Sequence, residues 1–137
     1  MGIKRKAREF ALQILFQREF DQSKELRDIV AQFVQNFDVD SDVGKMGSKI
    51  VNGTIENLEV IDNQLSQVSR NWSTSRMAFV DLNILRIASF EILYLSDDTP
   101  FKVAIDEAIE LAKKYGSTES AAFINGILDQ LAKQKGA

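Results

Sequence analysis

The sequence predicts an all-α protein. Apolar residues recur at intervals of three and four through most of the chain, which is the spacing of one face of a helix. No part of the chain reads as a run of alternating strands, and the 7 glycines and 1 proline rarely interrupt the periodic segments. A length of 137 residues suits one domain, or two small halves that share a core.

The first helix is expected over residues 4–20. Its core stripe consists of Ala7, Phe10, Ala11, Ile14 and Leu15. Phe16 lies on the opposite side, in a row with Arg5. An aromatic ring in line with a guanidinium could stack on a nucleobase beside a phosphate contact. Alternatively, Phe16 packs against a second neighbour, because helices of small bundles often bury two faces.

A cluster of basic residues opens this helix: Lys4, Arg5, Lys6 and Arg8. The chain as a whole carries a net charge of −3, so this basic end stands against an acidic remainder. Such an end indicates a polyanionic partner, and the alternative is a solvated helix start or a disordered tail.

A second helix is expected after Ser23, which suits an N-cap. Its inner side consists of Leu26, Ile29, Val30, Phe33 and Phe37. The acidic residues 38–42 suggest a calcium loop, but Val43 and Lys49 occupy the positions that require glycine and glutamate. Carboxylates that precede a helix and favour its positive end are therefore the better interpretation.

The third helix is expected over residues 43–65. Gly47 and Gly53 weaken it locally and favour the close approach of a neighbouring helix. A polar connection follows over residues 66–76. Within it, Arg70, Trp72 and Arg76 could lie on the surface, anchor the core or contact RNA.

Residues 77–95 predict a central helix, because fourteen of the nineteen are apolar. Asp81, Arg86 and Glu91 argue against a membrane span, since each would be costly near the bilayer centre. Arg86 must reach a carboxylate or solvent, because an unpaired buried charge costs about 3–5 kcal/mol.

Two further helices complete the prediction. Thr99 is expected to cap the first of them, with Pro100 at its first position and Gly116 as a left-handed stop. Ser117 is expected to cap the final helix. The pair at 125–126, Asn-Gly, is unfavourable in mid-helix by about 1 kcal/mol, so a packing reason is expected.

The composition excludes several kinds of chemistry. The chain has no cysteine and no histidine, which removes disulfides, cysteine metal sites, the usual general base and every histidine triad. It contains neither a Gly-rich dinucleotide loop nor a Walker pattern. Acids at helical spacing, such as Asp106 and Glu110, are typical of a solvated face and not of a catalytic pair. With no visible targeting segment, a cytoplasmic protein is expected.

Three segments of the C-terminal half have a distinctive sequence: residues 84–88 (Ile-Leu-Arg-Ile-Ala), residues 99–113 from Thr-Pro-Phe-Lys-Val to Ala-Lys, and residues 123–129 (Phe-Ile-Asn-Gly-Ile-Leu-Asp). In these segments the chain resembles the NusB family of bacterial transcription antitermination factors. The basic residues 4–11 also resemble the arginine-rich start of that family.

The resemblance implies an all-α fold in which two three-helix-bundle halves, about residues 1–65 and 66–137, pack together in one domain. It implies a non-enzymatic factor that needs no cofactor and no metal. Such a factor would bind single-stranded boxA RNA of nascent rRNA operons together with the ribosomal protein NusE. The complex rides on RNA polymerase and helps it to pass terminators.

The resemblance also implies site residues. Lys4, Arg5 and Arg8 match the basic RNA contacts of the family, and Phe123 matches a phenylalanine at the RNA surface. Phe16 replaces a frequent tyrosine, so stacking remains without the hydroxyl hydrogen bond. Asp81 and Glu119 match acidic positions near the face that RNA and the protein partner share. Arg86, Glu91, Asn125 and Asp129 also match, and buried pairing explains them equally well.

Two alternatives stay open at this stage. A similar helical domain precedes the catalytic part of some rRNA cytosine methyltransferases, although this chain contains no Gly-rich methyl-donor site and no catalytic cysteine. The chain could also be a protein-only scaffold, such as a homodimer whose apolar helices meet other helices.

Overall fold

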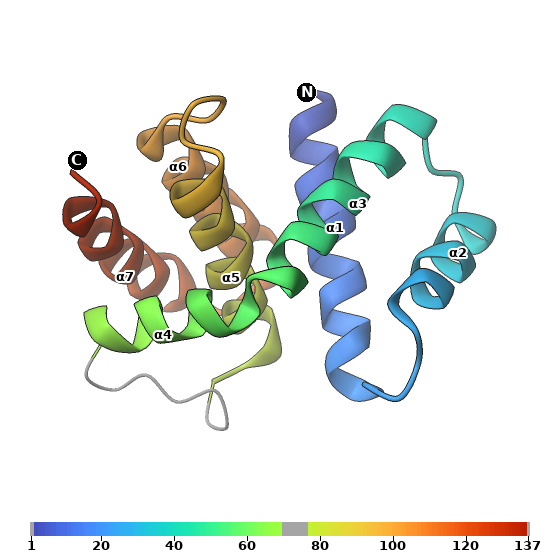
Figure 1. Cartoon of the computed structure of the whole chain (residues 1–137), viewed down its shortest axis with the longest axis horizontal. Coiled ribbons are helices and arrows are strands. Elements are labelled where there is room, and N and C mark those ends of the chain that lie inside the picture. The colour runs from blue at the N-terminus through green and yellow to red at the C-terminus, as the bar shows by residue number, and fades with distance from the viewer. Residues whose placement is uncertain (1, 70–76, 137) are drawn as a thin grey trace.

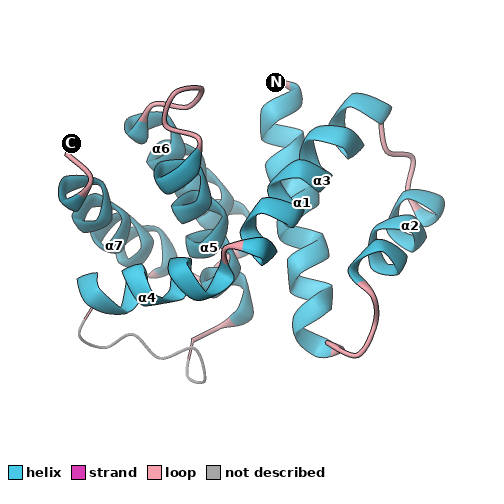
Figure 2. Ribbon diagram, in the orientation of Figure 1, coloured by secondary structure: helices cyan, strands magenta, loops and turns pink. Residues whose placement is uncertain are grey.

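The computed structural model describes residues 2–69 and 77–136, which form seven helices joined by loops (Figures 1 and 2). The helices are α1 (Ile3–Phe20), α2 (Leu26–Asn36), α3 (Ser41–Glu56), α4 (Leu58–Val68), α5 (Phe79–Tyr94), α6 (Phe101–Tyr115) and α7 (Ser120–Gln134). The all-α prediction is confirmed over these residues. Arg70, Trp72 and Arg76 lie outside the described residues.

The apolar helix α5 lies at the centre of the molecule, as its composition predicted. It packs against α1, α3, α4, α6 and α7, and its residues from Leu82 to Ile92 are all buried. Around it, α1 packs with α2 and α3, whereas α4 packs against α5 and α7 (Figure 1). The helices therefore fall into the groups α1–α3 and α4–α7. The expected division of the chain near residue 65 stays a prediction, because α5 packs against helices of both groups.

The expected third helix is two helices. The chain leaves α3 at Asn57, whose backbone N–H bonds to Gly53 and whose side-chain amide donates to the Gly53 carbonyl at 2.7 Å. The apolar period continues through α4, which buries Ile61 and Leu65. Because the same period runs through both helices, hydrophobic spacing alone did not reveal the break.

Arg86 of α5 has the carboxylate partners that its burial requires. Its guanidinium donates to Glu19 of α1 at 2.7 Å and to both carboxylate oxygens of Asp62 of α4 at 3.1 and 2.9 Å. The expected pairing is confirmed, and it ties one helix of each group to the central helix.

Several expected helix ends were wrong. Glu25 and not Ser23 is the N-cap of α2, and the Phe37 side chain is exposed beyond the end of that helix. Pro100 is the N-cap of α6, so Thr99 lies one residue before it. Asp40 does cap α3, since its side chain accepts from the Asp42 backbone N–H at 2.9 Å.

The turn between α6 and α7 differs from the prediction. Gly116 has a φ of −96°, so it is not a left-handed stop. A Cβ there would lie 2.6 Å from the Ser120 hydroxyl oxygen, and glycine is needed for this close approach. Ser117 precedes α7 instead of capping it, and its backbone N–H donates to the Ser120 hydroxyl at 2.9 Å.

Two glycines of α3 allow close helix packing, as predicted. A Cβ on Gly47 would overlap the ring of Phe10 in α1, and a Cβ on Gly53 would overlap the ring of Phe90 in α5. Gly126 was expected to have a similar role, but apart from its chain neighbours and the backbone of its own helix, no atom of the described residues lies within 4 Å of a Cβ placed there. That expectation was wrong.

None of the helices in the described parts of the chain is long and apolar enough to cross a membrane. The longest, α1, has 18 residues and carries the basic cluster, whereas the apolar α5 has 16 residues.

We predict opposite effects of alanine at two of these glycines. Gly53→Ala should lower the free energy of unfolding by about 1–3 kcal/mol, because the new methyl group overpacks against Phe90. Gly126→Ala is the matched control, and it should raise that free energy by about 0.5–1 kcal/mol through helix propensity. Urea denaturation measures both values. Equal stability of the two variants would contradict the close approach of α3 to α5.

Candidate nucleic-acid interface

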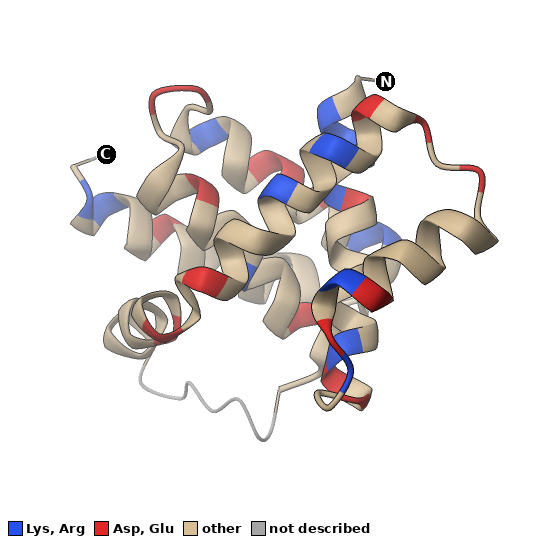
Figure 3. Cartoon of the chain, turned by 45° about the vertical axis from the view of Figure 1, so that its right-hand side comes forward, with Lys and Arg blue, Asp and Glu red and all other residues tan. Residues whose placement is uncertain are grey.

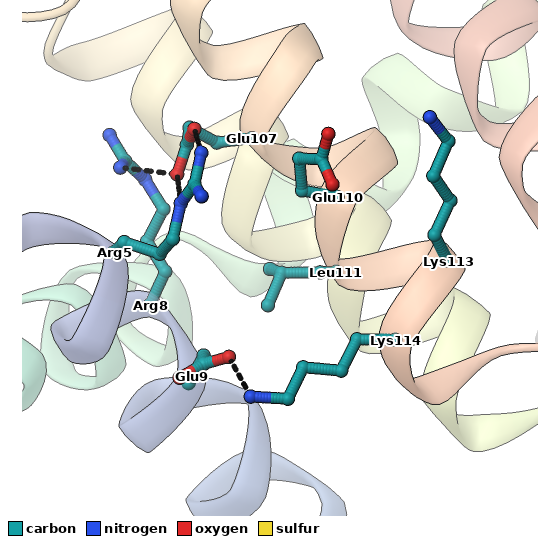
Figure 4. A pocket seen from close by; sticks show the side chains of 8 residues that line it. All are labelled: Arg5, Arg8, Glu9, Glu107, Glu110, Leu111, Lys113 and Lys114. Carbon is teal, nitrogen blue, oxygen red and sulfur yellow. Dashed lines mark hydrogen bonds and ion pairs between the residues drawn. The ribbon is translucent and has the colours of Figure 1, made fainter. Parts of the chain in front are cut away.

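Arg5 is held by a carboxylate of α6. Its Nε donates to Oε1 of Glu107 at 2.9 Å and its Nη2 donates to Oε2 at 2.6 Å, which is a bidentate pair (Figure 4). This hydrogen bond lowers the pKa of the Glu107 carboxyl and raises the pKa of Arg5. Both groups are therefore charged at neutral pH, and the guanidinium has a defined position at the start of α1.

Arg8 does not face solvent, which corrects its expected role as an RNA contact. The residue is 5% exposed, and its Nη2 and Nε donate to the two carboxylate oxygens of Glu91 at 2.7 and 2.9 Å. Glu91 belongs to the buried face of α5 and is 3% exposed. Arg8 Nη1 also lies 3.6 Å from Glu107. We therefore assign Arg8 to the positioning of α1 and not to the exposed surface.

A second ion pair crosses between α1 and α6 one turn further along. Lys114 donates to Glu9 at 2.6 Å, and this contact raises the pKa of the lysine. The two ion pairs lie in a groove of about 250 Å³ (Figure 4). We call it the α1–α6 groove, and its lining consists of Arg5, Arg8, Glu9, Glu107, Glu110, Leu111, Lys113 and Lys114.

Lys4 and Lys6 are the exposed cations of the basic end. Neither forms an ion pair with any residue in ranges 2–69 and 77–136. The adjacent arginines, in contrast, are paired with Glu91 and Glu107. The surface charge at the start of α1 is thus carried mainly by Lys4 and Lys6, while Arg5 and Arg8 are held by ion pairs.

Phe16 packs and is also accessible. Its ring is half-buried and meets the ring of Phe20 edge-on, with centroids 5.0 Å apart. It also lines a hollow with Leu12, Val80 and Tyr115. Packing against a neighbour and stacking on a nucleobase are therefore not exclusive for Phe16, because a ring that packs along one edge can still expose a face to a base.

The remaining candidate residues lie on α5 and α7. Phe123, in the first turn of α7, is 41% exposed, and no ring of the described residues stacks with it. Glu119 is exposed at the N-cap of α7. Asp81 lies in the first turn of α5, and its buried Oδ1 has no hydrogen-bond partner among the described residues.

The matched residues Asn125 and Asp129 are not buried. Both are exposed, and Asp129 forms a surface pair with Lys133 at 3.1 Å. Burial and pairing do hold for Arg86 and Glu91. Buried pairing therefore explains two of the four matched residues and not the two of α7.

Sequence reasoning missed the acidic partners of the basic end. Glu91 carried a usable signal, because a glutamate inside an apolar helix needs a cationic partner. Arg8 carried another, since it lies one helical turn from the buried Leu12 and two turns from Leu15. The residues next to Glu107 in the sequence are both polar and apolar. Nothing in this local sequence therefore indicated the ion pair with Arg5.

Comparison with known proteins gives the family. The model of the NusB family matches residues 5–133. The chain belongs to the NusB family. It is 45% identical over 131 residues to the transcription antitermination protein NusB of Trichlorobacter lovleyi, an alignment that covers 96% of this chain and 91% of the relative. The NusB family is one of transcription antitermination factors and not of enzymes.

Solved NusB structures share the fold. NusB of T. maritima matches with a TM-score of 0.86 and 38% identity, covering 96% of this chain and 91% of that one. A structure of the antitermination factors NusB and NusE in complex with double-stranded RNA matches with a TM-score of 0.86, 22% identity and 98% coverage of both chains. At that identity the likeness establishes the fold alone.

We predict that Arg8 is required for stability. Arg8→Ala should lower the free energy of unfolding by about 3–5 kcal/mol, because it leaves the Glu91 charge buried without a partner. Replacing both residues by leucine should recover much of this loss, since no charge then stays buried. Urea denaturation measures the difference. A loss below about 1 kcal/mol for Arg8→Ala, as for an exposed pair, would contradict the buried pairing.

Proposed function

We propose that this chain binds single-stranded boxA RNA of nascent rRNA operons together with the ribosomal protein NusE, and thereby supports processive transcription by RNA polymerase in the cytoplasm. The observation that carries the proposal is the basic end of α1, where Lys4 and Lys6 stay exposed and have no ion-pair partner among the described residues of an acidic chain. Membership of the NusB family supports the choice of RNA as the polyanion.

The proposed phosphate contacts come from lysine and arginine in different ways. Lys4 and Lys6 are mobile point charges that attract the backbone of a single strand. Arg5 is 37% exposed at its side chain and stays oriented by Glu107, so a phosphate at the surface would meet a guanidinium of fixed direction. The acidic remainder of the chain limits non-specific binding of RNA elsewhere.

Base contacts are proposed for the exposed aromatic rings. Phe123 offers an accessible ring at the start of α7, and Phe16 offers one face beside Val80 and Tyr115. Stacking of a base on such a ring contributes about 1–3 kcal/mol without a strong sequence preference. These rings would therefore add affinity for RNA, and other contacts would recognise the base sequence.

The proposed partner surface includes the acidic residues Asp81 and Glu119. Asp81 as a whole is only half-buried, so its carboxylate charge can attract a cationic group of NusE. Glu119 is exposed at the N-terminus of α7, where a carboxylate is stabilised by the helix dipole. A double substitution to asparagine and glutamine tests whether these charges contribute to NusE binding.

We predict that the two exposed lysines set the salt dependence of RNA binding. Lys4→Gln with Lys6→Gln should reduce the magnitude of the log–log salt slope by about 1.4, because each phosphate contact on a single strand contributes about 0.7. The measurement is fluorescence anisotropy of labelled boxA-like RNA and of a scrambled control, with and without NusE.

The matched control is Lys24→Gln with Arg27→Gln, two exposed cations at the start of α2. It should leave the salt slope unchanged. If the Lys4 and Lys6 variant kept both the affinity and the slope of the parent chain, the basic end would not be the RNA site. If the boxA-like and scrambled RNAs bound equally well, both with and without NusE, the chain would bind RNA only through charge and without sequence preference.

We also predict that Phe123→Ala weakens RNA binding by about 1–3 kcal/mol through the loss of stacking. The free energy of unfolding should change little, because the ring is 41% exposed. Tyr94→Ala is the control, since Tyr94 is similarly exposed on α5. Anisotropy titration reports the affinity and urea denaturation the stability. An affinity loss equal in both variants would remove Phe123 from the proposed site.

A further inference from the structure

A second and larger groove lies on the other side of the first turns of α1. Its volume is about 850 Å³, and it is bounded by α1, by α3 and by the connection between α5 and α6. Arg8 lines both this groove and the α1–α6 groove, so the start of α1 separates the two. A space of this size is within the range of pockets that hold small ligands.

The groove has an apolar floor and a basic edge. Met46 and Ile50 of α3 line it together with Leu95, which follows α5. Lys45 and Lys49 are each one residue before these two floor residues, so the helical period places both lysines along one edge. Lys4 of α1 lines the groove as well. We call this feature the lysine-edged groove.

The charge of the groove favours an anion. Lys4, Lys45 and Lys49 are exposed and have no ion-pair partner among the described residues, whereas the acids at the groove are Asp42 and Asp98. Arg8 and Glu91 also line it, but they neutralise each other. Figure 3 shows basic residues of α3 on the same side of the molecule as the basic start of α1.

An unstacked nucleotide combines the two chemistries that this groove offers. Its base has apolar faces that suit Met46 and Ile50, and its phosphates suit a row of lysine ammonium groups. Lys4 belongs both to this groove and to the basic end that is proposed to bind RNA. A strand held at Lys4 therefore enters the groove without crossing an uncharged surface. This continuity favours RNA over an acidic peptide as the occupant.

We infer that the bound RNA passes over the first turn of α1 and places a nucleotide in the lysine-edged groove, with its phosphates at Lys45 and Lys49. This inference rests on the proposed function, and it extends the RNA site from α1 to α3. Neither lysine of α3 was among the residues that the sequence indicated for RNA binding.

The test substitutes the two lysines of α3 in the full chain. Lys45→Gln with Lys49→Gln should reduce the magnitude of the salt slope for boxA-like RNA by about 1.4, which corresponds to two lost phosphate contacts on a single strand. The matched control is Lys24→Gln with Lys135→Gln, two exposed lysines away from the groove. Thermal unfolding of each variant confirms that the fold is retained.

Photo-crosslinking gives a second readout that does not depend on charge. RNA that carries 4-thiouridine at single positions is irradiated with the unsubstituted protein, and the attached peptides are identified by mass spectrometry. At least one position should crosslink to the peptide that contains Met46 and Ile50. Crosslinks confined to α1, α6 and α7 would overturn the inference.

The outcomes separate this inference from the proposed function. If the parent chain prefers boxA-like RNA and the Lys45 and Lys49 variant binds it with the same affinity and slope, the inference fails and the proposed function stands. If the parent chain binds neither RNA, both fail. If the variant loses NusE binding but keeps its RNA binding, the groove is a protein site and the inference is overturned.

Discussion

The buried ion pair between Arg8 and Glu91 is the interaction on which the arrangement of the basic end depends. It joins the first turns of α1 to the far end of α5, where both side chains are almost completely inaccessible. Two charges in such a place are tolerated only as a well-hydrogen-bonded pair, and three N–H···O contacts connect them. The pair therefore restricts α1 to positions in which these two residues meet.

Glu107 extends this pairing to the surface. It accepts hydrogen bonds from Nε and Nη2 of Arg5 and lies near Arg8, so three helices contribute to one chain of alternating charges. The two arginines are thus occupied by acids, and the lysines beside them remain available. The four basic residues thus differ in environment: Arg5 and Arg8 are held by ion pairs, and Lys4 and Lys6 are exposed.

The second constraint is the close packing of α3. Its glycines let the rings of Phe10 and Phe90 approach the helix backbone, so α3 lies tightly against both α1 and α5. On the same helix, Lys45 and Lys49 line the lysine-edged groove together with Lys4 of α1. Small residues in the core thereby decide which lysines lie near Lys4.

The all-α class, the central α5 and the need of Arg86 for carboxylates follow from the amino-acid sequence alone, because helical periodicity and burial of charge are local properties. The break at Asn57 and the start of α7 did not follow, since the apolar period is the same on both sides of a break and several polar residues suit a cap. The roles of Arg5 and Arg8 required the folded chain. Glu91 and Glu107 are 83 and 102 residues away from Arg8 and Arg5, and only the packing of α1 against α5 and α6 brings these opposite charges into contact.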